Sequence, residues 1–304
     1  MKRILNCFAS DFKELKGKDL LDSIQASEGR TIVSEIVVPV QPLYPEISNP
    51  EIVSAFGADL LLLNMFDVNN PAIAGIDSEG SQVIKKLKEL TGRPIGINLE
   101  PVDPAAEAAE ELLTLPVGRT ATTESLLKVK ELGIDFVCLT GNPKTGVTND
   151  EILKAISNAK TILGDDVSII AGKMHGAGVK GEAGHSILND EIIEKFIHAG
   201  ASVILIPSPG TVPGITVERA NQWVSTVHQN GALAMLTIGT SQEGADSTTI
   251  KQIALQNKMV GADLHHIGDA GYTGIAIPEN IMDYSIAIRG KRHTYIRMAA
   301  SINR

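Results

Sequence analysis

The feature that most constrains the fold of this chain is a repeated unit, in which a helix-length segment ends on glycine and a short apolar run follows. The clearest copies are AFGADLLLLN at 55–64, ELGIDFVCLT at 131–140, HAGASVILIP at 198–207 and MVGADLHHIG at 259–268. Glycine is common just past a helix end because it adopts a positive φ without strain. Short apolar runs bounded by turn formers are typical of strands buried on both faces. The pattern therefore predicts alternating helices and parallel strands.

Looser copies of the unit, together with TIVSEIVV, bring the expected strands to eight. They are predicted at 31–38, 59–66, 94–100, 135–141, 167–173, 202–207, 233–239 and 263–268. Eight successive units favour a closed α/β barrel of the (β/α)8 or TIM type over an open doubly wound sheet. An open sheet has fewer strands, and its first turn often carries GxGxxG, which is absent after the first strand here.

The first thirty residues precede this pattern and have a different character. Residues 1–30 are interpreted as a helical preamble that covers the bottom of the barrel, and residues 31–304 as a single catalytic barrel domain. An alternative is that RILNCFA at 3–9 forms a further strand, which would make nine.

Composition and charge limit the classes of partner. The net charge is −9, which argues against nucleic acid or an anionic membrane as a partner but leaves room for a small anionic metabolite bound by a local positive field. The two cysteines, Cys7 and Cys138, are far apart, and no apolar run reaches the ~18 residues of a membrane helix. A cytoplasmic protein is expected. The basic C-terminal segment 289–304 closes the last helix or forms a subunit contact, and a homo-oligomer is expected.

Polar residues recur at the C-terminal ends of the predicted strands, where barrels of this type build their active sites. The expected catalytic residues are Glu35, Glu100, Lys173 and His175. Three amides at strand ends, Asn64, Asn98 and Asn142, are expected to bind substrate.

Two glycine-rich loops follow the last two strands, IGTSQEGADSTT at 238–249 and IGDAGYTG at 267–274. Barrels often bind phosphate at this position through backbone N–H groups and a helix N-terminus. The expected anion-binding residues are Gly239, Thr240, Ser241, Gly244, Ser247, Gly268, Asp269, Ala270 and Gly271. The alternative is that these residues simply form tight turns. The acidic Asp269 speaks against a bare phosphate cup, and it could instead orient loop amides or bind a substrate hydroxyl.

The segment AGKMHGAGVKGEAGH at 171–185 has the composition of a mobile lid over the site. Lys173 could form a Schiff base or act as a fixed cation towards a substrate phosphate or carboxylate, and the fixed cation is favoured. His175 is a candidate general acid or base, the alternative being a solvated loop histidine.

A divalent cation such as Mg²⁺ is a further expectation, with Glu35, Asp67 and Glu100 as its ligands. The alternative is that these carboxylates hold loops or substrate hydroxyls. His265 and His266 are adjacent on a strand, so they point to opposite faces and cannot form a chelating pair.

The motifs RTIVSE, FGADLLLLN, GINLEP, LTGNP, AGKMHGAG, IGTSQEG and IGDAG resemble those of an uncharacterised bacterial TIM-barrel family. That family is loosely labelled phosphoenolpyruvate-mutase-like or haloacid-dehalogenase-like hydrolase. The resemblance spans nearly the whole chain and implies a barrel. Two motifs depart from those labels: Lys173 is followed by MHG where the mutases and isocitrate lyases carry a KxCG-type loop, and TIVSEIVV has no DxDx nucleophile motif.

Three functions follow as hypotheses. The first is a lyase, aldolase or isomerase that abstracts a proton from a small phosphorylated or carboxylated metabolite at the barrel mouth. The second is a metal-dependent hydrolase that uses Glu35, Asp67 and Glu100. The third is a non-catalytic barrel that binds a metabolite.

Overall fold

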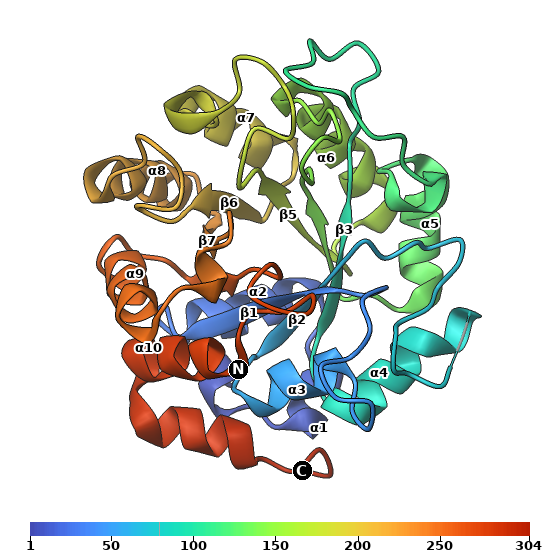
Figure 1. Ribbon diagram of the computed structural model, residues 1–304, viewed down its shortest axis with the longest axis vertical. Helices are drawn as coiled ribbons and strands as arrows, with labels where there is room; N and C mark the ends of the chain where they lie inside the picture. The colour runs from blue at the N-terminus through green and yellow to red at the C-terminus, as the bar shows by residue number, and fades with distance from the viewer. Residues whose placement is uncertain (79) are drawn as a thin grey trace.

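The computed structural model describes residues 1–78 and 80–304 and shows one closed barrel of eight parallel strands in the order β1 to β8 (Figure 1). The strands are β1 (Thr31–Val37), β2 (Leu60–Asn64), β3 (Ile95–Leu99), β4 (Phe136–Leu139), β5 (Ser168–Gly172), β6 (Val203–Pro207), β7 (Leu233–Ile238) and β8 (Leu264–Ile267). Each lies within the range predicted from the sequence. The (β/α)8 barrel is therefore confirmed.

Helices surround the strands as an outer ring (Figure 1). The ring is formed by α3 (Asn49–Ala55), α4 (Val83–Thr91), α5 (Thr123–Leu132), α6 (Asn149–Leu163), α7 (Asp190–Ala199), α8 (Val217–Gln229), α9 (Ser247–Met259) and α10 (Pro278–Ala299). Short 3-10 turns are η2 (Gly80–Gln82), η3 (Val117–Arg119), η4 (Gly184–Ser186) and η5 (Gln242–Gly244). The last helix bends at Gly290, whose φ of 74° and ψ of 165° are not helical.

The N-terminal segment is helical, as predicted, and consists of η1 (Ile4–Asn6), α1 (Ala9–Glu14) and α2 (Gly17–Gln25). The alternative of a strand at 3–9 is wrong, because residues 4–6 form a 3-10 turn. Ile4, Phe12 and Leu20 belong to the same apolar cluster as the interior residues of the barrel. The preamble therefore closes the lower end of the barrel with apolar side chains.

Alternation along the strands divides the side chains into two apolar clusters. Residues that face the barrel interior, such as Val33, Leu62 and Cys138, pack with the preamble. Their sequence neighbours pack outward against the helices. The interior is full: a Cβ at Gly96 would lie 2.1 Å from the ring of Phe136. Since successive residues point to opposite faces, each polar residue near a strand end is directed either into the mouth or outward.

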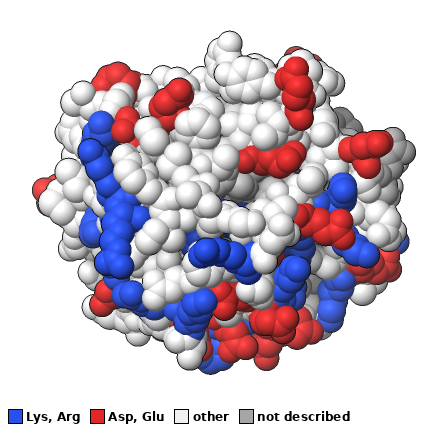
Figure 2. Space-filling model, turned by 90° about the horizontal axis from the view of Figure 1, so that it is seen from below, with Lys and Arg blue, Asp and Glu red and all other residues white. Residues whose placement is uncertain are grey.

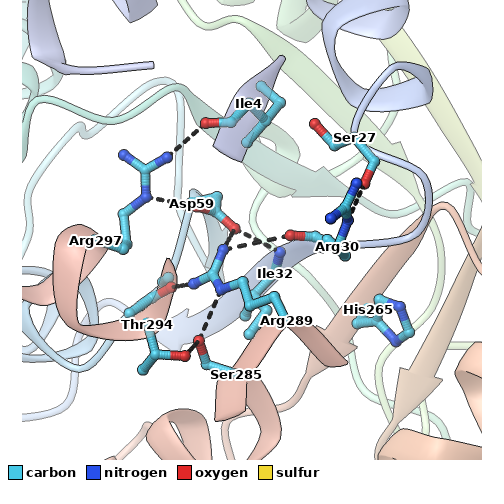
Figure 3. Close-up of polar contacts among 12 residues, drawn as sticks. Ile4, Ser27, Arg30, Ile32, Asp59, His265, Ser285, Arg289, Thr294 and Arg297 are labelled. Atoms are coloured by element: carbon cyan, nitrogen blue, oxygen red, sulfur yellow. Dashed lines mark hydrogen bonds and ion pairs between the residues drawn. The ribbon is translucent and has the colours of Figure 1, made fainter. Parts of the chain in front are cut away.

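A buried charge cluster joins the first and last parts of the chain at the lower end of the barrel (Figure 3). The carboxylate of Asp59 accepts a hydrogen bond from the Ile32 N–H at 2.8 Å and one from Arg289 at 2.6 Å. Arg297 forms an ion pair with the other carboxylate oxygen at 2.7 Å. The same two arginines donate to the carbonyls of Gly57, Ile4 and Cys7. One carboxylate thus ties β1, β2, the preamble and α10 together.

Positive charge exceeds negative charge in this cluster. Burial and the nearby Arg297 lower the pKa of Arg93 to about 9, while Asp59 opposes the shift. Burial also lowers the pKa of Arg289, again against the effect of Asp59. Asp59 therefore supplies the negative charge that stabilises three buried guanidinium groups.

We expect Asp59→Asn to destabilise the protein by about 3–5 kcal/mol, because removing one partner of a buried ion pair leaves the other charges uncompensated. Urea denaturation followed by circular dichroism measures this. Asp165→Asn is the control, since Asp165 is 87% exposed and pairs with Lys160 at the surface. Equal stability of the two variants would contradict the assigned role of Asp59.

Figure 2 shows the face seen from below the view of Figure 1, where Lys and Arg form a broken band flanked by Asp and Glu. This face therefore carries both signs of charge. None of the helices in residues 1–78 and 80–304 is long and apolar enough to cross a membrane.

Candidate active site

A cavity of about 510 Å³ opens at the C-terminal end of the barrel. Its wall is formed by the ends of β1, β2, β7 and β8, the loops after β4 and β5, and part of the excursion after β3. The polar side chains on it that carry the argument below are Glu35, Asn64, Asn142, His175, Glu243 and Asp269. The mouth predicted from the strand ends is thus a real cavity with ionisable walls.

Glu35 lies on the cavity wall and is held from behind by two buried side chains. Asn98 on β3 donates to its Oε1 at 2.6 Å, and Nε2 of His266 on β8 lies 3.0 Å from its Oε2. Both partners are almost fully buried. Each carboxylate oxygen therefore has one fixed partner and keeps acceptor capacity for a group in the cavity.

Asp269, in the loop after β8, is joined to the amides of Asn64 and Asn142. Asn64 donates from Nδ2 to Asp269 Oδ2 at 2.7 Å and to Asn142 Oδ1 at 2.9 Å, and Asn142 donates back to Asn64 Oδ1 at 2.9 Å. Burial raises the pKa of Asp269 well above its ordinary value, and the charges of Glu35 and Glu243 add to the effect. The two amides therefore line the cavity and also hold Asp269 in position.

Glu243, in η5, is a third carboxylate of the cavity and is 1% exposed. Its Oε1 accepts the Ala270 N–H at 2.9 Å, which links the loops after β7 and β8. Its Oε2 is buried and has no hydrogen-bond partner among the described residues. Burial raises the pKa of this carboxyl. One oxygen of Glu243 therefore joins two loops, and the other is buried without a partner among the described residues.

His175, in the loop after β5, presents a defined hydrogen-bonding face to the cavity. Its Nδ1 accepts the Ala177 N–H at 3.1 Å. Burial lowers the pKa of its imidazole, which favours the neutral ring at neutral pH. A neutral imidazole whose Nδ1 is an acceptor carries its proton on Nε2. His175 is thus arranged as an Nε2–H donor.

Three loops are joined into a roof over the cavity. Antiparallel bridges pair Val102 with Val147 and Ala108 with Val179. The Ala109 N–H donates to Gly178 O at 2.8 Å, and the Lys180 N–H donates to Glu107 O at 2.9 Å. The lid expected after β5 is therefore tied to the excursion after β3 and the loop after β4.

Lys173 does not face the cavity, which corrects its expected catalytic role. Its ammonium is buried, donates to Val147 O at 3.2 Å and forms an ion pair with Glu182. The reason is strand parity: Ile170 faces the barrel interior, so Lys173, three residues later, points outward. It joins the lid segment to the barrel and is not among the residues that line the cavity.

The predicted metal ligands Glu35, Asp67 and Glu100 do not come together. Glu100 pairs with Arg119 at 2.6 Å and accepts the Asn142 N–H at 2.9 Å. Asp67 accepts the Asn69 N–H in its own loop at 2.8 Å. Neither lies on the cavity wall. The described residues contain no group of three or more His, Cys, Asp or Glu side chains placed to hold a metal ion. Glu100 and Asp67 hold loops, so the catalytic role expected for Glu100 is also not supported.

The residues predicted to bind an anion divide into two groups by their position. Gly239, Thr240, Ser241, Gly268, Asp269 and Ala270 line the cavity, whereas Gly244, Ser247 and Gly271 do not. The backbones at Gly244 and Gly271 pack on each other: a Cβ on Gly244 would lie 3.1 Å from Gly271 O. The first N–H groups of α9 are capped by Asp246, which accepts from Thr248 and Thr249. Gly244 and Gly271 therefore serve loop packing, and the carboxyl groups of Glu243 and Asp269 lie at the cavity edge where a phosphate was expected.

The backbone is strained in the loop after β7, at the edge of the cavity. Thr240 and Ser241 adopt left-handed conformations with φ of 59° and 74°, which is costly for residues other than glycine and especially for a β-branched one. Strain of this kind concentrates at functional sites.

Two residues of the site were missed by sequence reasoning. Glu243 stands within the IGTSQEG motif, and the available signal was an acidic residue inside a glycine-rich loop at the C-terminal end of a strand. His266 was recognised only as unable to chelate together with His265. The structure confirms their opposite directions, since His265 contacts Tyr284 and Gly29 while His266 contacts Glu35.

Residues 5–304 match the sequence profile of DUF7916, a domain of unknown function. The chain belongs to the DUF7916 family. A search of functionally curated proteins finds no match to it.

Solved structures similar to this DUF7916 barrel include three barrel proteins. A putative fructose-1,6-bisphosphate aldolase from Coccidioides immitis has 13% identity and a TM-score of 0.53, covering 94% of this chain and 96% of its own. A 2,3-dimethylmalate lyase of the PEP mutase/isocitrate lyase superfamily has 10% identity and a TM-score of 0.52, covering 88% and 82%. An oxaloacetate acetylhydrolase has 14% identity and a TM-score of 0.51, covering 84% and 80%. Identities this low establish the fold alone. A closed barrel is also not the Rossmann-like sheet that a dehalogenase label requires.

We expect Lys173→Met to loosen the segment 174–189 without unfolding the barrel. A charge-assisted hydrogen bond contributes about 1.5–3 kcal/mol, so amide hydrogen exchange there should become about 10- to 100-fold faster. Hydrogen-exchange mass spectrometry measures this. Lys180→Met is the matched control, because the Lys180–Glu107 pair is exposed at the surface. Unchanged exchange in Lys173→Met would show that the buried pair does not anchor the lid.

Proposed function

We propose that this protein is an enzyme that transfers a proton in a lyase-type or isomerase-type reaction at the barrel mouth. The observation that carries the proposal is Glu35, a carboxylate on the cavity wall whose two oxygens are each fixed by a buried partner. A base held in one orientation avoids the cost of reorganisation when it abstracts a proton.

His175 provides the complementary group. His175 lines the same cavity, and the charge of Glu35 opposes the lowering of its pKa by burial, so the two groups lie within each other's field. A neutral imidazole donor can stabilise the negative charge that develops on a carbonyl oxygen when the adjacent C–H is deprotonated. Glu35 is then the base and His175 the hydrogen-bond donor to the enolate.

The charges on the cavity wall indicate which class of substrate the site favours. The part of the wall formed by described residues carries no Lys or Arg, and three of its carboxylates come from different elements. This disfavours the phosphorylated metabolite expected from the glycine-rich loops. The similar structures include proteins described as a lyase and an aldolase, and we extend that general chemistry to this chain as part of the proposal.

The test is proton exchange in D₂O with small hydroxy- and amino-carbonyl compounds of positive, zero and negative charge. Nuclear magnetic resonance follows deuterium entering the position next to the carbonyl. We expect Glu35→Gln to slow this exchange by about 10²- to 10⁴-fold, the usual contribution of a general base. The fold should persist, since the amide oxygen of the substituted side chain can still accept from Asn98.

Asp165→Asn is the control and should exchange at the wild-type rate. Exchange that is equally fast in Glu35→Gln would remove Glu35 as the base. Ligand binding without any exchange would favour the non-catalytic metabolite-binding barrel instead.

A further inference from the structure

We propose that the substrate of this cavity carries a protonated amine, which lies between the carboxyl groups of Asp269 and Glu243. The inference deepens the proposed function, because it uses the same cavity and takes Glu35 as the base beside the bound amine. It is tested by binding alone, without turnover.

The first argument is the charge on the wall. Glu35, Glu243 and Asp269 come from β1, η5 and the loop after β8. Glu110 from the roof also lines the cavity, but Lys144 already pairs with it at 3.2 Å, and Lys173 pairs with Glu182 away from the cavity wall. Carboxylates gathered in a partly buried cavity require a positive partner, and the described part of the wall does not supply one.

The second argument is an oxygen without a partner. Glu243 is 1% exposed, and its Oε2 makes no hydrogen bond to any described residue. A buried carboxylate oxygen left unpaired is costly, and because Glu243 lines the cavity, a ligand bound there can supply the missing donor. An ammonium group has three N–H donors, enough for Glu243 Oε2 and a free position on Asp269.

At the lower end of the barrel, the single carboxylate of Asp59 contacts two arginines, so each of its oxygens has a cationic partner. No Lys or Arg of the described residues lines the cavity at the mouth, so the carboxyl groups of Asp269 and Glu243 have no such partner there. The raised pKa of Asp269 is consistent with this, since a proton can replace the missing cation in the free protein.

Other ligands fit less well. A phosphate would meet three carboxylates and loop amides that already donate to Glu243 and Asp246. A neutral polyol could donate hydrogen bonds but would leave the charges unmatched. A divalent cation would need a ligand group that the described residues do not form.

The experiment is isothermal titration of the full chain with three probes of similar length at one ionic strength: 1,3-diaminopropane, 1,3-propanediol and malonate, with MgCl₂ titrated separately. We expect the diamine to bind with a Kd at least about tenfold lower than that of the diol, as for a buried charge pair. Malonate should bind more weakly than the diol.

Asp269→Asn and Glu243→Gln should each raise the diamine Kd about tenfold or more, because each removes one partner charge. Both substitutions retain an oxygen that accepts the existing hydrogen bond from Asn64 or Ala270. Asp165→Asn removes one exposed negative charge away from the cavity and should leave the diamine Kd unchanged.

Four results would overturn the inference. The first two are equal binding of the diamine and the diol, and tighter binding of malonate than of the diamine. The other two are an equal loss of diamine affinity in Asp165→Asn, and MgCl₂ binding that both cavity variants abolish and with which the diamine does not compete. Amine binding without deuterium exchange for any compound would contradict the proposed function and support this inference. Deuterium exchange confined to neutral or anionic compounds would support the proposed function and contradict this inference.

Discussion

Closure of the sheet between β1 and β8 is the constraint on which the rest of the structure depends. The two strands pair in parallel, with Thr31 beside Leu264 and Ser34 beside Ile267. This pairing places Glu35 against His266, which is 231 residues away in the chain. It also fixes which residue of every strand faces the interior, because the pleat is continuous around a closed barrel. The cavity, its base and the outward direction of Lys173 all follow from that register.

The charged groups at the two ends of the barrel have different surroundings. At the lower end, Asp59 is surrounded by arginines, and apolar residues of the preamble fill the remaining space. At the mouth, three carboxylates stand on a cavity wall, with an unpaired oxygen on Glu243 and strained backbone at Thr240 and Ser241. The charge cluster at the lower end is closed by the preamble, to whose carbonyls Arg297 donates, whereas the carboxylates at the mouth line a cavity. This access to a cavity is the main reason for placing the chemistry at the mouth.

The roof gives the cavity its shape and part of its polarity. The loops after β3, β4 and β5 are joined by short bridges, and the buried Lys173–Glu182 pair holds the last of them to the barrel. His175 belongs to this roof and Glu35 to the barrel wall. The proposed donor and base therefore come from two different parts of the molecule, the roof and the barrel wall.

The sequence by itself determined the barrel, since glycine-ended helices and apolar runs at regular spacing depend only on local backbone preferences and burial. It also identified much of the mouth, because Glu35, Asn64, Asn142, His175 and Asp269 lie at or just beyond strand ends, where a parallel barrel must open. Only the tertiary structure decided which strand-end residues share the cavity. In these strands apolar residues face both the barrel interior and the surrounding helices, so the apolar pattern does not indicate which face a residue takes. For this reason Lys173 was expected in the mouth and lies behind it, and the support of Glu35 by His266 became visible only when the barrel closed.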